Sequence, residues 1–388
     1  MNSVNTWWSQ ASGLGILVSG GAPSVYLAAG ALCAFYQHQV SFDVIAASGA
    51  GTLPGLLYAV PKGGNQVQAL ENTVNFNIYD AIYASFRTNY KVFHKSGAFS
   101  QLLWQWGQML PRFPLTLQTA YHESLQRLYN DWIDLLVTAV TPTELNYFSK
   151  SVLTRIGVVE EHIDWPALPH YPKEYYVNAF NINTYNLDLF NKHTLTPQSF
   201  YAALAMPWLY RPVTANGQTY TEGASHDPSG LEALLCYGRI PDIHTIIVLD
   251  TLSVDIWTDP ENIYDALQIT IMDPIIALSE YILSLYGVLE ARANTQAERT
   301  GDPSQALPKL YRVPFPIPQW EVPKIFTWSS SNAFTLWHIG YDAVDTFCRA
   351  LHAGDLTALE SYRYHHYCQP KPRMHDFLTL FDELLEDS

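Results

Sequence analysis

Charged side chains are scarce in this sequence. They make up 15% of its 388 residues, and acidic residues outnumber basic ones by 36 to 21, which leaves a net charge of −15. No cluster of lysine and arginine offsets this charge. A surface of that sign repels phosphate backbones and anionic membranes. We therefore expect no nucleic acid among the partners.

Cysteines are also few, and no pair of them has the spacing of metal ligands. The four are Cys33, Cys236, Cys348 and Cys368. A disulfide framework needs a denser pattern, so we expect reduced thiols in a cytoplasmic protein. His365, His366 and His375 have no convincing acidic or thiol neighbour except Cys368. We expect neither a metal nor a cofactor.

No charged residue precedes Asp43, and the stretch from Leu14 to Tyr36 is largely apolar. A signal peptide carries a basic start, and a membrane span needs about 20 uninterrupted apolar residues. Gly20, Gly21 and Pro23 interrupt this stretch. A buried strand followed by a tight turn and a helix explains it better.

The first sixty residues predict alternating strands and helices. Ile16–Val18 is a short apolar run typical of a strand, and apolar residues then recur at helical spacing from Val25 to Tyr36, with Ser24 as candidate cap. A second strand is predicted at Phe42–Ala46 and a second helix at Leu53–Val60. This βαβ pattern indicates a parallel sheet that binds ligands at the carboxyl ends of its strands.

The rest of the chain adds elements to this core. Strands are predicted at Tyr175–Ile182, Leu187–Phe190 and Thr245–Leu249, and helices at Ile263–Ala293 and Ser329–Leu351. We expect residues 10–300 to form one α/β domain, with an aromatic-rich helical insert at about 66–165. Residues 301–388 are expected to form a proline-rich connector and a helical extension packed on the core. Trp104 and Trp106 of the insert fit either core packing or a lid or interfacial face.

Two blocks of sequence carry a family resemblance. Leu17 to Ala59 contains a strand, a glycine loop, a helix, a second strand and the sequence ASGAG, and Ala202 to Pro228 contains the sequence TEGASHDP. Both resemble the corresponding blocks of patatin-like phospholipases. The resemblance implies a three-layer α/β fold with a parallel sheet, and hydrolysis of acyl lipids by a serine that a carboxylate activates. Its oxyanion loop maps onto Gly20, Gly21 and Ala22.

The nucleophile elbow permits two registers. Alignment without gaps places Gly49 at the position of the nucleophile, with Gly51 as a small flanking residue and Ser48 one step early. The rival register makes Ser48 the nucleophile, although a serine then bears the strained backbone of the elbow. Gly49 adopts such a backbone at almost no cost.

Glu222 stands where the family has an aspartate. Its extra methylene moves the carboxylate by about 1.5 Å, enough to break a hydrogen bond set for the shorter side chain. The sequence nevertheless nominates Ser48 and Glu222 as the catalytic pair. His226 and Asp227 follow closely as accessory candidates, with a turn before Pro228 as the plainer interpretation.

Three functions follow from these residues. The first is a lipid acyl hydrolase that uses the Ser48–Glu222 pair on an apolar ester. The second is a non-hydrolytic enzyme in which Glu222 acts as acid or base on a lipid or isoprenoid-like substrate. The third is a catalytically inactive lipid-binding protein. For each we expect an apolar small-molecule ligand, and we expect a cytoplasmic protein that makes transient contact with membrane surfaces.

Overall fold

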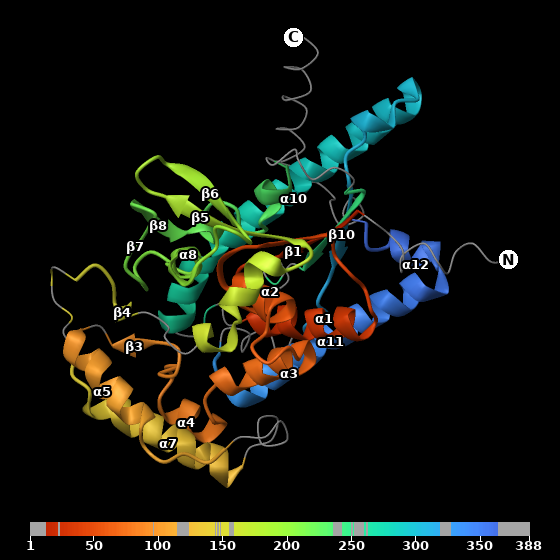
Figure 1. The fold of residues 1–388 in the computed structure, drawn as a ribbon. Helices are drawn as coiled ribbons and strands as arrows, with labels where there is room; N and C mark the ends of the chain where they lie inside the picture. The colour runs from red at the N-terminus through yellow and green to blue at the C-terminus, as the bar shows by residue number, and fades with distance from the viewer. Residues whose placement is uncertain are drawn as a thin grey trace.

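A computed structural model gives the fold (Figure 1). It describes residues 13–363 except 22–23, 96, 115–123, 144, 146, 148, 155–158, 236–242, 250, 252–259, 261–262 and 319–326. The core is one mixed sheet of eight strands in the order β10-β9-β1-β2-β5-β8-β7, with β6 also paired to β5. The predicted α/β class with a parallel sheet is confirmed, because β10, β9, β1, β2 and β5 run parallel to one another.

The predicted βαβ unit is confirmed at the start of the chain. It consists of β1 (Leu14–Val18), α1 (Val25–Gln37), β2 (Val44–Ala47) and α2 (Thr52–Ala59). The predicted cap is wrong: the Ser24 hydroxyl makes no capping bond and instead donates to the carbonyl of Gly21 at 3.2 Å. Ser24 has helical backbone angles, so its side chain does not reach the free N–H groups of α1.

The strands of the second half extend this sheet on both sides. The two strands predicted at 175–182 and 187–190 are present as β5 (Glu174–Asn181) and β6 (Asn186–Asn191), and they pair antiparallel. The hairpin β7 (Val213–Ala215) and β8 (Gln218–Glu222) follows α8 (Pro197–Ala203), and β9 is Thr245–Leu249. Strand β10 (Lys309–Val313) pairs in parallel with β9 and lies where only an extended connector was expected. Residues 309–313 therefore belong to the sheet.

Helices cover both faces of the sheet, which gives three layers. Side chains alternate along the strands, so Ile16, Ile45 and Val177 pack under α1 and α11 (Ser330–Ala353), whereas Leu17 and Ala46 pack under α9 (Leu231–Leu235) and α10 (Ile263–Thr300). The chain then continues into α12 (Leu356–Glu360). Helix α11 lies along α1 (Figure 1).

One described helix, at Ile269–Thr300 within α10, is long and apolar enough to cross a membrane by length and composition. In the structure Met272, Ile276, Leu283 and Tyr286 form one buried row along it. The last two of these belong to the core on the α10 side of the sheet. A buried row with period 3 to 4 is typical of a helix that covers a sheet.

The insert forms a helical lobe beside the sheet (Figure 1). Its strands β3 (His94–Lys95) and β4 (Leu153–Thr154) pair with each other in a separate two-stranded sheet. The helices of the lobe and its surroundings are α3 (Gln66–Glu71), α4 (Asp80–Ser85), α5 (Ala98–Gln108) and α7 (Leu125–Val140), with 3-10 turns at Asn72–Phe76, Val159–His162 and Trp165–His170.

Helices α1 and α11 cross at two glycines that admit no side chain. A β-carbon on Gly30 would lie 1.9 Å from the carbonyl oxygen of Trp337, and one on Gly340 would lie 2.0 Å from that of Leu27. We therefore expect Gly340→Ala to lower the free energy of unfolding by at least about 3 kcal/mol, since the helices must separate. Urea unfolding measures this loss. The control is Thr346→Ala, on the exposed side of α11, and equal stability of the two variants would contradict the close crossing.

Candidate active site

Three parallel strands end level with one another and bring the loops after them together. Val18 at the end of β1 lies beside Ala47 of β2 and Leu249 of β9. The N–H of Ser48 donates to the carbonyl of Val18 at 3.1 Å, and the hydroxyl of Thr251 donates to the carbonyl of Gly20 at 2.7 Å. The glycine loop and the elbow are therefore neighbours, at the carboxyl edge where α/β sheets bind ligands.

The elbow places its left-handed residue at Gly49. Gly49 has φ +47°, whereas Ser48 is extended, with φ −129° and ψ 143°. A β-carbon on Gly51 would lie 2.3 Å from the carbonyl oxygen of Ser19, so only glycine fits against the end of β1. The backbone thus follows the register that puts Gly49 where the nucleophile of such an elbow stands.

The hydroxyl of Ser48 is fully buried and turned to Asp227. It donates to the main-chain carbonyl of Asp227 at 2.7 Å, and the amide of Asn178 donates to the same oxygen at 2.9 Å. Among the described residues no hydrogen bond joins Ser48 to Glu222. The structure does not bring the two nominated catalytic side chains together, and the role of Ser48 as a nucleophile stays a prediction.

Glu222, the last residue of β8, does face the elbow. A β-carbon on Gly49 would lie 2.6 Å from its Oε1 atom and 2.9 Å from the β-carbon of Ala224. The side chain is 8% exposed, and within the described part of the chain its carboxylate has no hydrogen-bond partner. Burial raises the pKa of Glu222 to about 7. Near neutral pH this group can therefore both accept and donate a proton.

Tyr210 provides a second polar group near Glu222, and the sequence analysis did not predict it. Its phenol is buried and lacks a hydrogen-bond partner among the residues that the structure describes. Burial, with a smaller contribution from the negative charge of Glu222, raises the pKa of Tyr210 above its usual value. The tyrosine lies within the second block of the resemblance, but only the folded loop before β7 brings it near Glu222.

Two cavities flank this centre. An apolar cavity of about 60 Å³ borders the elbow at Ala50 and includes Val25, Leu53, Leu204 and Trp328 in its lining. A larger cavity of about 490 Å³ is lined by Tyr210, Tyr201 and Leu204, and by the cationic side chains of Lys150 and Arg211. Leu204 lines both, so an apolar pocket and a wider mouth with basic groups adjoin at this residue.

In the glycine loop, one of the backbone N–H groups expected to bind an oxyanion is already hydrogen bonded within the protein. The N–H of Gly20 already donates to the carbonyl of Pro228 at 3.1 Å. Gly21 has φ +124°, and its N–H has no protein acceptor in the described part of the chain. Ala22, the third nominated residue of the oxyanion loop, lies outside the described residues. Gly21 therefore supplies the free donor on which an oxyanion would depend.

The accessory candidates lie next to the site without facing it. The carboxylate of Asp227 accepts the N–H groups of Gly230, Leu231 and Glu232, so it caps the start of α9. The ring of His226 stacks on Phe180 at 3.6 Å between centroids and is exposed. Asp227 thus acts on the site only through its main-chain carbonyl, which holds Ser48.

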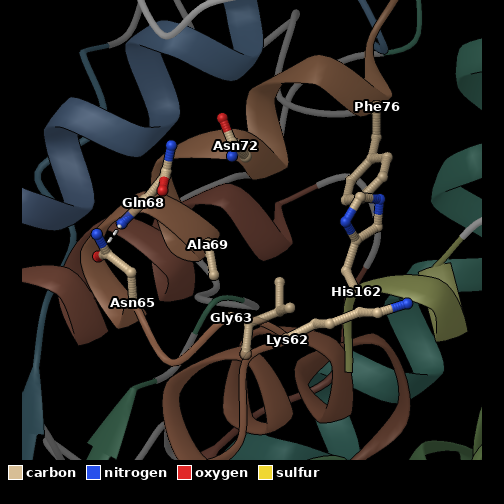
Figure 2. A pocket seen from close by; sticks show the side chains of 9 residues that line it. Lys62, Gly63, Asn65, Gln68, Ala69, Asn72, Phe76 and His162 are labelled. Carbon is tan, nitrogen blue, oxygen red and sulfur yellow. Dashed lines mark hydrogen bonds between the residues drawn. The ribbon is translucent and has the colours of Figure 1, made fainter. Parts of the chain in front are cut away.

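A third, polar cavity of about 110 Å³ lies behind Phe76, whose ring also borders the apolar cavity (Figure 2). It is lined by Lys62, Asn65, Gln68 and His162, and the ring of His162 lies 5.6 Å from that of Phe76. Within the described residues no three potential metal ligands come together. The histidines and the cysteine singled out near the C-terminus, at 365, 366, 375 and 368, lie outside the described residues.

A glycine loop after the first strand, a left-handed elbow after the second and an acidic residue facing that elbow define an α/β acyl-hydrolase architecture. The chain belongs to the patatin-like phospholipase family, whose model matches residues 16–235. The predicted family is thus confirmed, and the family consists of lipid acyl hydrolases. No curated protein gives a significant match. Among solved structures, VipD from Legionella pneumophila is similar with a TM-score of 0.35 and 12% identity, covering 88% of this chain and 67% of VipD.

Proposed function

We propose that this protein hydrolyses an acyl lipid by means of Glu222, which activates a water molecule in place of the family's serine. The carboxylate takes a proton from water, and the resulting hydroxide attacks the ester carbonyl carbon. The oxyanion that forms accepts a hydrogen bond from the N–H of Gly21. When the C–O bond breaks, protonated Glu222 returns its proton to the leaving alcohol.

The observation that carries this proposal is the position of Glu222 against Gly49. The side chain is buried, its pKa is raised to about 7, and it points at the site from which a serine hydroxyl is missing. A general base works best when its pKa lies near the working pH. Ser48, by contrast, is buried and hydrogen bonded to Asp227.

The two cavities suggest the class of substrate. The apolar lining of the cavity beside Ala50 suits the hydrocarbon part of a substrate, and Lys150 and Arg211 in the wider cavity suit an anionic headgroup. We propose a phospholipid as the substrate. The unpartnered phenol of Tyr210 is suited to donate a hydrogen bond to the substrate or to the attacking water.

Ser48→Ala tests this mechanism against the Ser48–Glu222 pair. We expect hydrolysis of phosphatidylcholine in mixed micelles to stay within about threefold of the wild type, because only a bond to a carbonyl that Asn178 still satisfies is lost. A fluorophosphonate probe should label neither protein. Loss of turnover in Ser48→Ala, together with labelling of the wild type, would establish the serine mechanism instead.

A lipid-binding protein without turnover is the second candidate. The hydrogen bond from the Gly20 N–H to the carbonyl of Pro228 favours this candidate, because that N–H is then not available to an oxyanion. Phospholipid that co-purifies with the chain, without release of fatty acid from any phospholipid tested, would support this candidate. Products other than a free fatty acid, lost in Glu222→Gln, would instead point to acid–base chemistry without hydrolysis.

A further inference from the structure

Helices α5 and α7 each turn a row of apolar side chains to solvent. On α5 and the residue after it, Phe99, Leu102, Trp106 and Met109 are exposed at spacings of three and four. On α7 the exposed row is Leu125, Tyr129, Trp132, Leu136 and Val140. These nine residues are called the aromatic face below. Met109 is 80% exposed and Leu125 83%, so no described part of the chain covers them.

The charged residues of α7 are turned the opposite way. Arg127 and Asp131 are fully buried, and the Asp134 side chain is 13% exposed. The guanidinium of Arg127 donates to the carbonyls of Val74 and Asn77, each at 3.1 Å. Helices on the surface of soluble proteins normally bury their apolar side and expose their charges. The exposed side of α7 is therefore suited to an apolar environment.

Ion pairs hold this reversed orientation in place. Lys91 pairs with Asp131 at 2.5 Å, and Arg112 pairs with Asp134 at 2.6 Å. Helices α5 and α7 also pack closely, because a β-carbon on Gly107 would lie 2.7 Å from a methyl group of Val137. Rotating α7 to bury its apolar row would expose Val137 and break these buried pairs. The aromatic face is therefore a fixed feature of the insert.

We infer that the aromatic face docks onto the surface of an uncharged or zwitterionic lipid layer. None of the exposed residues described on α5 or α7 is charged, although the chain as a whole carries −15. This face can therefore meet a neutral lipid interface without bringing charge to it. Tryptophan and tyrosine, which the face contains at 106, 129 and 132, are the side chains that favour such interfaces.

The insert that carries this face also contributes to the larger cavity of the candidate site. Leu153 of β4, in the same insert, lines that cavity. The N–H groups of Val152 and Leu153 donate to the carbonyls of Trp208 and Leu209, directly before Tyr210. Docking through the insert therefore holds the cavity mouth near the lipid surface. The binding itself does not depend on any reaction at Glu222.

Co-sedimentation of the full chain with phosphatidylcholine vesicles tests the inference. The wild type should bind, and Trp106→Gln/Trp132→Gln should lower the partition coefficient about tenfold or more, which corresponds to about 1.4 kcal/mol. Leu356→Gln, which changes an exposed apolar residue on α12, is the matched control and should bind like the wild type. Adding phosphatidylserine should weaken binding, because the chain is acidic.

Equal vesicle binding by the wild type and the double variant would overturn the inference. So would a wild-type dimer in sedimentation velocity that the double variant converts to a monomer, if neither protein binds vesicles. In that case the aromatic face would be an interface between two copies of the chain. Both changes lie on exposed side chains, and unchanged thermal unfolding of the double variant would show that its fold is intact.

Discussion

Glu222→Gln is expected to abolish turnover while making the protein more stable above pH 7. Glutamine keeps the size of the side chain but neither takes nor returns a proton. If Glu222 is the general base, hydrolysis should fall by at least about 100-fold. The gain in stability arises because the substitution removes a carboxylate that burial holds in an unfavourable environment.

The pH dependence of that gain has a definite sign. The pKa of Glu222 is raised from 4.5 to about 7 in the folded chain, so between these values the folded state binds more protons than the unfolded state. The stability of the wild type therefore falls as pH rises from about 4.5 to 7, by about 3 kcal/mol. Below pH 4.5 none of this stability is lost, and above pH 7 the loss is complete.

Urea unfolding of the wild type and Glu222→Gln at pH 4.5 and pH 8 measures the effect. We expect the difference between the two proteins to be small at the lower pH and to favour the variant at the higher one. Glu161→Gln, which removes an exposed charge, is the control and should show no such change. A variant that is less stable at pH 8 would mean that the carboxylate is stabilised by its surroundings.

Gly49→Ser combined with Glu222→Asp is expected to create a serine that a fluorophosphonate probe labels. A β-carbon at position 49 would lie 2.6 Å from Oε1 of Glu222, so Gly49→Ser alone displaces the carboxylate from its position. Aspartate withdraws the carboxylate by about 1.5 Å, to hydrogen-bond range of a serine hydroxyl. Gly49 and Glu222 are thus matched to each other, and only a paired change restores the family's dyad.

The probe should label the double variant and neither Gly49→Ser alone nor the wild type. Serine at φ +47° costs roughly 1–3 kcal/mol, so the double variant should unfold at lower denaturant concentration. The new β-carbon would also lie 2.9 Å from that of Ala224, which adds to this cost. A well-folded double variant that remains unlabelled would show that the loop at Gly20 and Gly21 does not support acyl transfer.

The sequence predicted the core of the fold because each of its elements has a local signal. Short apolar runs marked β1 and β2, apolar residues at helical spacing marked α1, and Pro61 and Gly63 marked the end of α2. Strand β10 was missed because Pro308 and Pro314 flank it so closely that its five residues read as a connector. Its pairing with β9 spans some sixty residues, and local patterns do not contain such contacts.

The site was predictable only in part for the same reason. The ungapped register already favoured Gly49 as the strained residue, since a glycine bears a left-handed backbone without cost. The direction of the Ser48 hydroxyl depends on the carbonyl of Asp227, 179 residues further along the chain. The position of Tyr210 near the charge of Glu222 depends likewise on the folded loop before β7.

The close crossing of α1 and α11 has a consequence for biosynthesis. Helix α1 has its neighbour α11 some 300 residues later in the chain, after β10 has been synthesised. A ribosome adds about 5 to 20 residues each second, so one face of the nascent sheet stays uncovered for tens of seconds. During this interval the apolar side of α1 is a natural target for chaperones, and truncations before residue 353 should remain bound to them.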